Sequence, residues 1–264
     1  MEKEGDIFYF HLKATLLDGG FWSFLCRDPS IILEKGEFLI VMAIKLILIR
    51  HGESDGNVQR MFCGFKDVEL TKKGIYQAER LAYRLKGLQV DVVYCSDLKR
   101  AKHTAEIVFG SRGIDIIPSS NLREMNFGTW EGYTFEEVKS KYGYGDEFNL
   151  WLENINEKIN ILQGESLVDL NNRVMTELDK IFKKHQKMNK DDTIAIVCHG
   201  GTVRVILCNV LNLELKYMYR IEQYPTALNI IDYYDNRGFI SLLNDTSHLE
   251  DWWESGLIQE KKDE

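Results

Sequence analysis

The chain has few of the features that mark multidomain or membrane-bound proteins. Only three of its 264 residues are proline, and no stretch rich in Pro, Gly or Ser divides it, so one compact unit is a better interpretation than two domains joined by a linker. The longest apolar run, residues 38–49, is interrupted by Lys45. A helix that crosses a bilayer needs roughly 20 apolar residues. We therefore expect no attachment to a membrane.

Positive charge and paired cysteines are also scarce. The net charge is −8, so binding to nucleic acid, which depends on clustered positive charge, is not expected. The N-terminus lacks the basic and apolar segments of a signal peptide. The cysteines are odd in number and form no Cys-x-x-Cys pair, which indicates neither a disulfide framework nor a zinc knuckle. They are Cys26, Cys63, Cys95, Cys198 and Cys208. We predict a cytoplasmic protein.

From residue 44 onward, apolar strands alternate with amphipathic helices. Strands are predicted over residues 44–49, 90–94, 114–117 and 193–198, and helices begin after Thr71, after Ser96 and Asp97, at residue 135, at Ser166 and at residue 202. Residues 227–234 and 238–243 resemble two strands joined by a turn. This order predicts a three-layer α/β/α sandwich with a mostly parallel central sheet. The segment 135–151 is predicted as a helical insertion over the active site.

Three parts are predicted along the chain. Residues 1–43 form an N-terminal extension of unassigned role, residues 44–249 the main domain, and residues 250–264 a charged tail. Met42 stands just before the first predicted strand, which leads to the hypothesis that the natural start of the protein lies at or near Met42. A peptide from upstream of Met42 in a mass spectrum of the native protein would contradict it.

Two of the predicted strands end in histidine. One runs into Arg50 and His51, the other into His199, and each histidine is followed by glycine. Because ligands of open α/β sheets bind beyond the carboxyl ends of the strands, we expect both imidazoles in one pocket. Either histidine alone would be interpreted as a structural turn residue, but the pair indicates a functional site. The guanidinium of Arg50 suits a phosphate group, which it binds through two parallel hydrogen bonds.

A histidine metal site is the alternative chemistry. Imidazoles bind zinc and iron readily. However, Arg50 beside His51 would repel a cation, and no His-x-x-x-His or His-x-His spacing occurs. We therefore predict no metal and no other cofactor. Of the remaining histidines, His103 is interpreted as a surface residue of a helix, and His185 as a residue that stabilises a lysine-rich helix end.

Further motifs are similar to those of a known family. They occur in order at residues 50–57, 70–78, 96–106, 122–132, 164–166 and 199–204. Together they closely resemble the histidine phosphatase superfamily, also called phosphoglycerate-mutase-like, over about residues 44–249. The resemblance implies an enzyme that cleaves phosphomonoesters without a metal, through a covalent phosphohistidine.

The resemblance also implies a role for each matching residue. His51 matches the nucleophile, and Glu124 matches the proton donor to the leaving alkoxide. The residues that match the surroundings of the phosphoryl group are Arg50, Arg100 and His199, with Asn57 at an accessory position, and further substrate contacts are expected at Gly64 and Gly200. Cys63 stands where relatives carry a small polar residue near the substrate, and both a contact and a plain loop thiol remain open. A neutral imidazole attacks phosphorus without first losing a proton.

The segment between Glu131 and Glu165 bears on the type of reaction. Mutases of the superfamily carry a longer, arginine-rich insertion in this region, whereas this segment contains no arginine, so hydrolysis is favoured over transfer. Residues 244–249 resemble bacterial α-ribazole phosphatases, which remove a 5′-phosphate in the assembly of the cobalamin lower loop. Aromatic residues that could contact a base-like substrate, or simply pack the insertion, are Tyr133, Phe135, Tyr142, Tyr144 and Trp151.

Several alternatives remain open beside an α-ribazole 5′-phosphate phosphatase. One is a broad-specificity sugar-phosphate phosphatase, another a phosphoglycerate mutase. A third is a non-catalytic protein that only binds phosphorylated ligands, although such relatives usually lose the nucleophile or an arginine, and this chain retains them. The expected partner is a small phosphomonoester, and the sequence indicates nothing about the oligomeric state.

Overall fold

A six-stranded sheet forms the centre of the molecule. The computed structural model describes residues 31–34, 37–40, 43–142, 161, 163–186, 192–234 and 237–250. The strand order is β5-β4-β6-β3-β7-β8. These strands are β3 (Ala43–Arg50), β4 (Val92–Ser96), β5 (Ile116–Ser119), β6 (Asp192–Cys198), β7 (Leu228–Tyr234) and β8 (Arg237–Asp245). The first four in this order are parallel, and β7 is antiparallel to both β3 and β8. The predicted mostly parallel sheet is confirmed.

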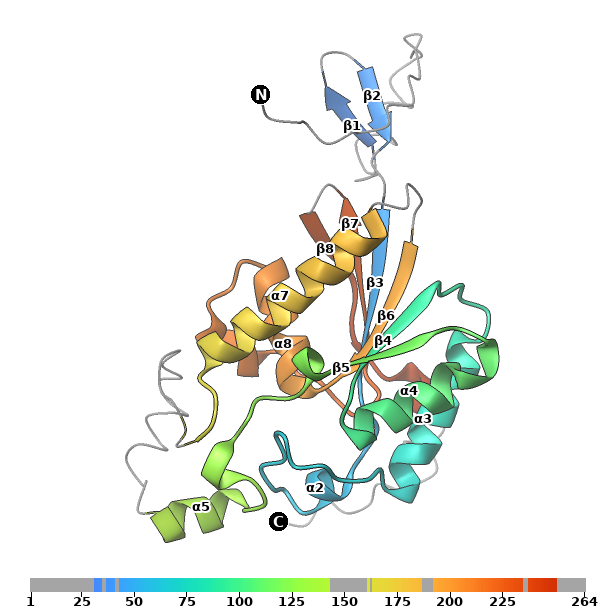
Figure 1. Cartoon of the computed structure of the whole chain (residues 1–264). Helices are drawn as coiled ribbons and strands as arrows, with labels where there is room; N and C mark the ends of the chain where they lie inside the picture. The colour runs from blue at the N-terminus through green and yellow to red at the C-terminus, as the bar shows by residue number, and fades with distance from the viewer. Residues whose placement is uncertain are drawn as a thin grey trace.

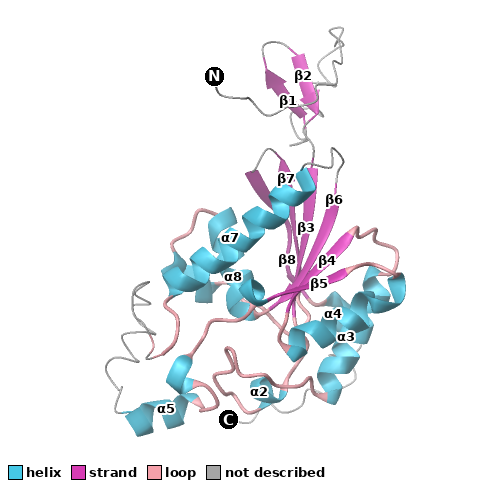
Figure 2. Ribbon diagram, viewed as in Figure 1, coloured by secondary structure: helices cyan, strands magenta, loops and turns pink. Residues whose placement is uncertain are grey.

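Helices cover both faces of this sheet (Figure 1). They are α3 (Lys72–Leu85) and α4 (Lys99–Phe109) on one face, and α7 (Leu167–Gln186) and α8 (Gly200–Val210) on the other. Because successive side chains of a strand point to opposite faces, Leu46 and Leu48 join the core under α7 and α8, while Ile47 and Ile49 join the core under α3 and α4. Figure 2 shows the resulting three layers, as predicted.

Shorter elements connect the layers. They are α2 (Asp55–Val58), α5 (Phe135–Tyr142) and the 3₁₀ segments Gly110–Arg112, Ser120–Leu122, Gly128–Trp130, Leu215–Arg220 and Ser247–Leu249. Both α2 and α5 lie at the end of the molecule where β3 finishes (Figure 1). An isolated antiparallel bridge between Met61 and Thr134 joins their neighbourhoods. Of the predicted helical insertion, α5 is the described part, and residues 143–151 lie outside the described residues.

Several predicted boundaries were wrong. Strand β4 ends at Ser96, so this residue closes the strand instead of capping the next helix. Helix α4 begins at Lys99, and its N-cap, Leu98, makes no side-chain capping bond. Asp97 pairs with Arg123 instead, at 2.6 Å between Nη2 and Oδ2. An ion pair with a distant loop therefore outcompetes a local cap. Helix α8 starts at Gly200, two positions before the predicted start at residue 202.

His185 lies in the last, lysine-rich turn of α7, the helix end that it was predicted to stabilise. Its side chain is buried, its Nδ1 lies 2.7 Å from Asp192 Oδ2, and its Nε2 lies 3.2 Å from the Tyr94 hydroxyl. These contacts join the last turn of α7 to the first residue of β6 and to the middle of β4. His185 therefore also links this helix end to the central sheet.

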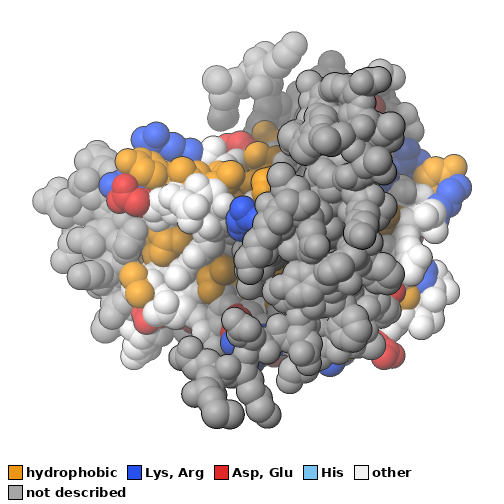
Figure 3. Space-filling model, turned by 90° about the horizontal axis from the view of Figure 1, so that it is seen from above, with side chains coloured by type: hydrophobic (Ala, Val, Ile, Leu, Met, Phe, Trp, Pro, Cys, Tyr) orange, Lys and Arg blue, Asp and Glu red, His pale blue; other side chains and the backbone are white. Residues whose placement is uncertain are grey.

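Part of the predicted N-terminal extension forms a strand pair. Strands β1 (Ile31–Glu34) and β2 (Glu37–Ile40) pair antiparallel, with Ile31 opposite Ile40. Within the described residues, no helix is both long and apolar enough to cross a bilayer. Where the view in Figure 3 shows described side chains, Lys and Arg are scattered among acidic and apolar ones, and no broad basic patch is visible.

Candidate active site

The two strand-end histidines lie side by side. Strands β3 and β6 are parallel neighbours with Arg50 opposite Cys198, so His51 and His199 follow at the same edge of the sheet. Their ring centroids are 5.1 Å apart, and the His51 backbone N–H donates to the Cys198 carbonyl oxygen at 2.9 Å. Both side chains are buried. The structure thus brings the two predicted site histidines into one location.

The His51 ring has a defined proton position. Its Nδ1 lies 2.7 Å from the carbonyl oxygen of Gly52, and because a carbonyl oxygen only accepts hydrogen bonds, Nδ1 carries the proton. Burial, followed by the charges of Arg100 and Arg50, holds the pKa of His51 well below its usual value. The ring is therefore neutral near pH 7 and keeps a lone pair on Nε2. This is the form that can attack phosphorus.

Several buried polar atoms at the site make no hydrogen bond within the described part of the chain. They are both ring nitrogens of His199 and Nε of Arg50. Buried polar groups are almost always paired, so such atoms call for a ligand. Burial, with the charges of Arg100, His51 and Arg50, keeps the pKa of His199 well below its usual value. A bound anion would raise the pKa of His199, because it favours the protonated ring and accepts its hydrogen bonds.

Positive charge gathers around the unpaired atoms. Arg50 Nη1 donates to the carbonyl oxygen of Gln223, and burial and the charge of Arg204 lower the pKa of Arg50 to about 10. A Cβ at Gly200 would lie 3.0 Å from Arg204 Nη1 and 3.5 Å from Arg50 Nε. The predicted site residue Gly200 therefore lets two guanidinium groups approach the same backbone. This arrangement suits an anion with several oxygens.

Arg100 holds the loop that follows α2. The guanidinium is 1% exposed and donates to three carbonyl oxygens, those of Cys63 (2.7 Å), Gly64 (2.8 Å) and Lys66 (2.9 Å). It also has the largest charge effect on the pKa of each site histidine. Arg100 thus lies close to both imidazoles and fixes the loop at the same time.

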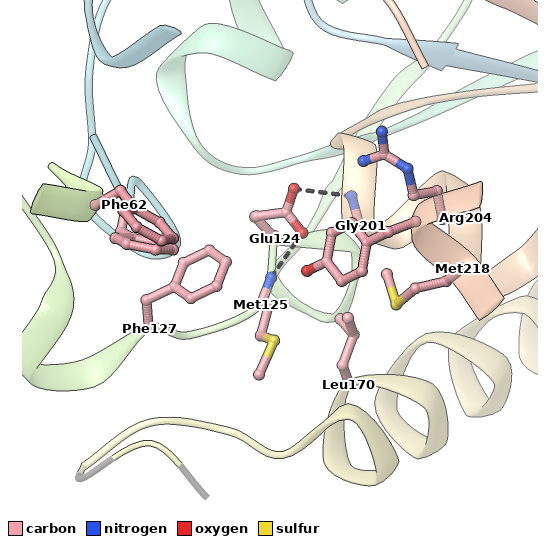
Figure 4. Close-up of a pocket in the computed structure, with 10 residues that line it drawn as sticks. Phe62, Glu124, Met125, Phe127, Leu170, Gly201, Arg204 and Met218 are labelled. Atoms are coloured by element: carbon pink, nitrogen blue, oxygen red, sulfur yellow. Dashed lines mark hydrogen bonds between the residues drawn. The ribbon is translucent and has the colours of Figure 1, made fainter. Parts of the chain in front are cut away.

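Glu124 contacts the start of α8. Its Oε2 accepts a hydrogen bond from the Gly201 N–H at 2.9 Å, and its Oε1 accepts one from the Met125 N–H at 2.9 Å (Figure 4). The loop that carries Glu124 is also held by Arg173 of α7, whose Nη2 donates to the Glu124 carbonyl oxygen at 3.1 Å. Arg173 also pairs with Glu165. Glu124 is thereby fixed next to the segment that carries His199.

A cavity of about 280 Å³ opens beside Glu124. Figure 4 shows Phe62 and Phe127 on one side and Arg204 on the other, and the two phenyl rings have centroids 5.0 Å apart. Most of the lining is aromatic or aliphatic. The lining residues are Phe62, Glu124, Met125, Phe127, Phe135, Leu170, Gly201, Arg204, Met218 and Tyr219. Among these described residues, Arg204 supplies the one positive charge.

Three other predicted contacts, Asn57, Cys63 and Gly64, do not line this cavity. Asn57 Oδ1 accepts hydrogen bonds from the N–H and the hydroxyl of Ser54, both at 3.0 Å, and so caps α2. The sulfur of Cys63 packs on the backbone, since a Cβ at Gly56 would lie 2.3 Å from it. Gly64 is packed against the Met125 carbonyl oxygen, which a Cβ there would approach to 2.0 Å. Their roles in substrate binding stay predictions.

Sequence reasoning found only part of the cavity lining. Of the predicted aromatic residues, Phe135 lines it and Tyr133 does not, while Tyr144, Trp151 and the side chain of Tyr142 lie outside the described residues. Lining residues that were missed are Phe62, Met125, Phe127, Met218 and Tyr219. Arg173, which holds the Glu124 backbone without lining the cavity, was missed as well. Arg204 belongs to a recognised motif, but no role followed from the motif alone. Among the described residues, no three His, Cys, Asp or Glu side chains gather to hold a metal ion.

Known proteins are similar to this chain in sequence and in fold. The model of the histidine phosphatase superfamily (branch 1) matches residues 46–246. Phosphoserine phosphatase 1 of Hydrogenobacter thermophilus is 31% identical over 210 residues, covering 80% of this chain and 96% of the relative. The adenosylcobalamin/alpha-ribazole phosphatase of Escherichia coli K12 is 28% identical over 182 residues, covering 68% and 86%. The solved structure of Bacillus stearothermophilus YhfR superposes with a TM-score of 0.70 at 30% identity, covering 78% of this chain and 99% of that one.

Proposed function

This chain belongs to the histidine phosphatase superfamily (branch 1), and we propose that it hydrolyses phosphomonoesters through a phosphohistidine formed on His51. One observation carries the proposal. The hydrogen bond from Nδ1 to the Gly52 carbonyl oxygen, 2.7 Å long, leaves Nε2 of a neutral ring free to attack. The phosphoryl group would then sit among Arg50, Arg100 and His199, whose buried polar atoms and positive charge match its oxygens.

In the first step, Nε2 of His51 forms a bond to phosphorus while the bond to the leaving oxygen breaks. Charge on the equatorial oxygens is stabilised by the two guanidinium groups and by His199, which becomes an effective donor once an anion is bound. Glu124 supplies a proton to the leaving alkoxide, for which its position beside Gly201 is suited. The products of this step are the alcohol and the phosphoenzyme.

In the second step, water attacks phosphorus and the nitrogen–phosphorus bond breaks. Glu124, now a carboxylate, takes a proton from this water, and inorganic phosphate leaves. His51 returns to its neutral form because the proton on Nδ1 never moves. Hydrolysis rather than transfer is supported by the Glu131–Glu165 segment, which contains no arginine to hold a second phosphorylated acceptor.

The cavity beside Glu124 supports a leaving alcohol with an aromatic or apolar body. Burial of such a body against Phe62, Phe127 and Met218 contributes roughly 25 cal/mol per Å² of apolar surface, and ring stacking adds about 1 kcal/mol. We therefore propose α-ribazole 5′-phosphate, whose alcohol carries a benzimidazole base, as the substrate. A sugar phosphate has no aromatic base to bury in this cavity and would leave its hydroxyl groups against apolar walls, which costs free energy.

Phosphoserine is the second candidate. One observation favours it, because the cavity holds Arg204, whose guanidinium suits the carboxylate of a serine product. The relative from Hydrogenobacter thermophilus is a phosphoserine phosphatase by name. Against it, Arg204 Nε already donates to the Ile221 carbonyl oxygen at 2.7 Å, and the rest of the lining offers few polar partners.

Trapping the intermediate tests the nucleophile. Rapid acid quench during turnover of ³²P-labelled substrate should leave label on a peptide containing residue 51, and the label should be lost on longer exposure to acid, as expected for phosphohistidine. His51→Ala should show neither label nor turnover. Turnover without label on residue 51, or normal turnover by His51→Ala, would exclude the scheme.

A substrate panel tests the leaving group. We expect the highest kcat/KM for α-ribazole 5′-phosphate in a comparison with phosphoserine, glucose 6-phosphate and 3-phosphoglycerate. Phe127→Ala should lower kcat/KM for α-ribazole 5′-phosphate about tenfold or more and affect phosphoserine less. If Arg204→Gln instead abolishes a dominant activity on phosphoserine, the second candidate is correct.

A further inference from the structure

The end of β8 and the short 3₁₀ segment after it contact helix α3. We call residues 244–249 the C-terminal strap. Its Asp245 forms a double ion pair with Arg84 of α3, with 2.8 Å between Nη1 and Oδ1. This pairing holds the pKa of Asp245 well below its usual value. The carbonyl oxygen of His248 accepts a hydrogen bond from Arg80 Nε at 3.1 Å. The strap is thus anchored on its outer side, while the His248 side chain is buried, at 6% exposure.

The buried end of His248 reaches Thr226. Nε2 lies 3.0 Å from Thr226 Oγ1, and the same hydroxyl donates to the Pro225 carbonyl oxygen at 2.7 Å. Since that proton is used, Oγ1 accepts from Nε2–H of His248. Burial, with the charge of Arg84, lowers the pKa of His248 to about 4. The ring is therefore neutral near pH 7, with its one proton on Nε2.

Thr226 has an unusual backbone conformation. Its φ is 56°, in the left-handed region that β-branched residues rarely adopt. Such a conformation persists only where the surroundings hold it, and it is found most often at functional sites. Here its hydroxyl is held by Pro225 on one side and by His248 on the other. The residue is fully buried, so these contacts are out of reach of bulk solvent.

The strained segment supports the proposed nucleophile directly. The Thr226 N–H donates to the His51 carbonyl oxygen at 3.2 Å, and the Ala227 carbonyl oxygen accepts from the Arg50 N–H at 3.3 Å. Consecutive residues of this loop therefore hold the backbones of the histidine and of the arginine beside it. A change in the Thr226 backbone would move both side chains together.

We propose that His248 and Thr226 are positioning residues, and that the hydrogen bond between them sets the place of His51 and Arg50 relative to the phosphoryl group. In this proposal both residues act through the backbones of His51 and Arg50. This inference rests on the proposed role of His51 as nucleophile. By this proposal the C-terminal strap contributes to the reaction, because it holds the residues that position His51 and Arg50.

Replacement of His248 tests the donor. His248→Leu keeps an apolar side chain in the site but removes the proton, whereas His248→Gln places an amide N–H near the position of Nε2. We expect kcat/KM for p-nitrophenyl phosphate to fall about 10²-fold in the leucine variant, as for a misplacement of about 1 Å, and less than about fivefold in the glutamine variant. Equal loss in both folded variants would overturn the hydrogen-bonding role.

His185 offers a matched control. It is also 6% exposed, and it is bonded at both ring nitrogens, whereas His248 is bonded at Nε2 and its buried Nδ1 has no hydrogen-bond partner among the described residues. His185 contacts the first residue of β6, at the end of that strand away from His199. His185→Leu should lower the melting temperature without a comparable fall in kcat/KM. If it lowers kcat/KM as much as His248→Leu does, loss of stability explains both results, and the proposal is wrong.

A pair of Thr226 variants provides an independent measurement should His248→Leu fail to fold. Thr226→Ser keeps the hydroxyl, and Thr226→Val keeps the branched shape without it. We expect the serine variant to retain kcat/KM within about threefold and the valine variant to lose about 10²-fold. Equal activity of the two variants would contradict the proposal.

A readout independent of catalysis separates this inference from the proposed function. In the folded protein labelled with ¹⁵N-histidine, the ring signals of His51 should shift in His248→Leu but not in His185→Leu. An inactive wild-type protein would refute the proposed function, and the His51 signals would still decide the positioning role. Unchanged His51 signals in His248→Leu would refute that role even in an active enzyme.

Discussion

Glu124 is docked on the backbone of Gly201. Its Oε2 accepts the Gly201 N–H at 2.9 Å, and a Cβ at that position would lie 2.1 Å from Glu124 Oε1, which is closer than atoms can approach. The glycine pair after His199 therefore has two separate uses. Gly200 makes room for guanidinium groups, and Gly201 makes room for the carboxylate that we propose as the proton donor.

Gly201→Ala is expected to displace Glu124 and to lower kcat/KM for alkyl phosphates by about 10²-fold or more, as for loss of general acid help. The protein should remain folded, because Glu124 is a side chain that can turn aside. Gly110→Ala is the control, since a Cβ at Gly110 meets nothing within 4 Å. Steady-state kinetics on both variants decides the point, and normal activity of Gly201→Ala would mean that Glu124 need not stay docked.

Glu124→Gln should reveal the proton donor through its dependence on the leaving group. Removal of a general acid lowers kcat/KM by about 10²- to 10⁴-fold for an alkyl phosphate, whose leaving alkoxide needs the proton. The fall is far smaller for p-nitrophenyl phosphate, whose phenolate leaves without a proton. Glu79→Gln, an exposed site on α3, controls for the loss of one negative charge. An equal loss on both substrates would assign Glu124 a role other than proton donation.

Arg100→Lys should be strongly deleterious although the charge is retained. The lysine ammonium cannot reach three carbonyl oxygens in the geometry of a guanidinium, so the loop from Cys63 to Lys66 would lose its anchor. We expect a fall in kcat/KM of about 10²-fold, together with weaker inhibition by inorganic phosphate. Arg112→Lys is the matched control, because Arg112 also donates to backbone carbonyl oxygens, those of Leu85 and Leu88, away from the site. Equal effects would contradict a specific role for Arg100.

The three layers and the proximity of His51 and His199 could both be predicted from the sequence. Apolar side chains at positions such as Leu46 and Ile47 specify a strand buried on both faces, and parallel neighbours such as β3 and β6 must finish at the same edge. Local patterns were less reliable for boundaries. Ser96 and Asp97 are residue types that often cap helices, yet Asp97 forms an ion pair with Arg123. A local sequence pattern does not predict an ion pair between distant segments.

The leaving-group cavity was beyond sequence reasoning for a physical reason. Phe62 and Phe127 come from separate loops and Tyr219 from a short 3₁₀ segment, and none belongs to a periodic pattern. Arg173 was missed because it appears as one polar position of an amphipathic helix, although it binds the carbonyl oxygens of Asn121, Arg123 and Glu124. Sites assembled from loops depend on tertiary contacts that single segments do not encode.

The stability of the protein should fall as the pH drops below about 6.5, through its buried histidines. The pKa values of His51, His199 and His248 are all lowered by burial. The unfolded chain therefore binds more protons than the folded one, and stability that is fully present above the unfolded pKa is lost as the pH falls towards the folded values. For His248, with a pKa of about 4, the loss between pH 6.5 and 4 amounts to roughly 3 kcal/mol.

Urea unfolding of wild type and His248→Gln at a series of pH values between 7.5 and 4.5 measures this contribution, because the effects of all other groups are common to both proteins. As the pH falls, the unfolding free energy of the wild type should decrease more than that of the variant, since glutamine takes up no proton. Phosphate should lessen the acid sensitivity of both proteins, because a bound anion stabilises protonated His199 and the guanidinium groups around it. Parallel pH curves for wild type and variant would show that His248 does not remain neutral in the folded protein.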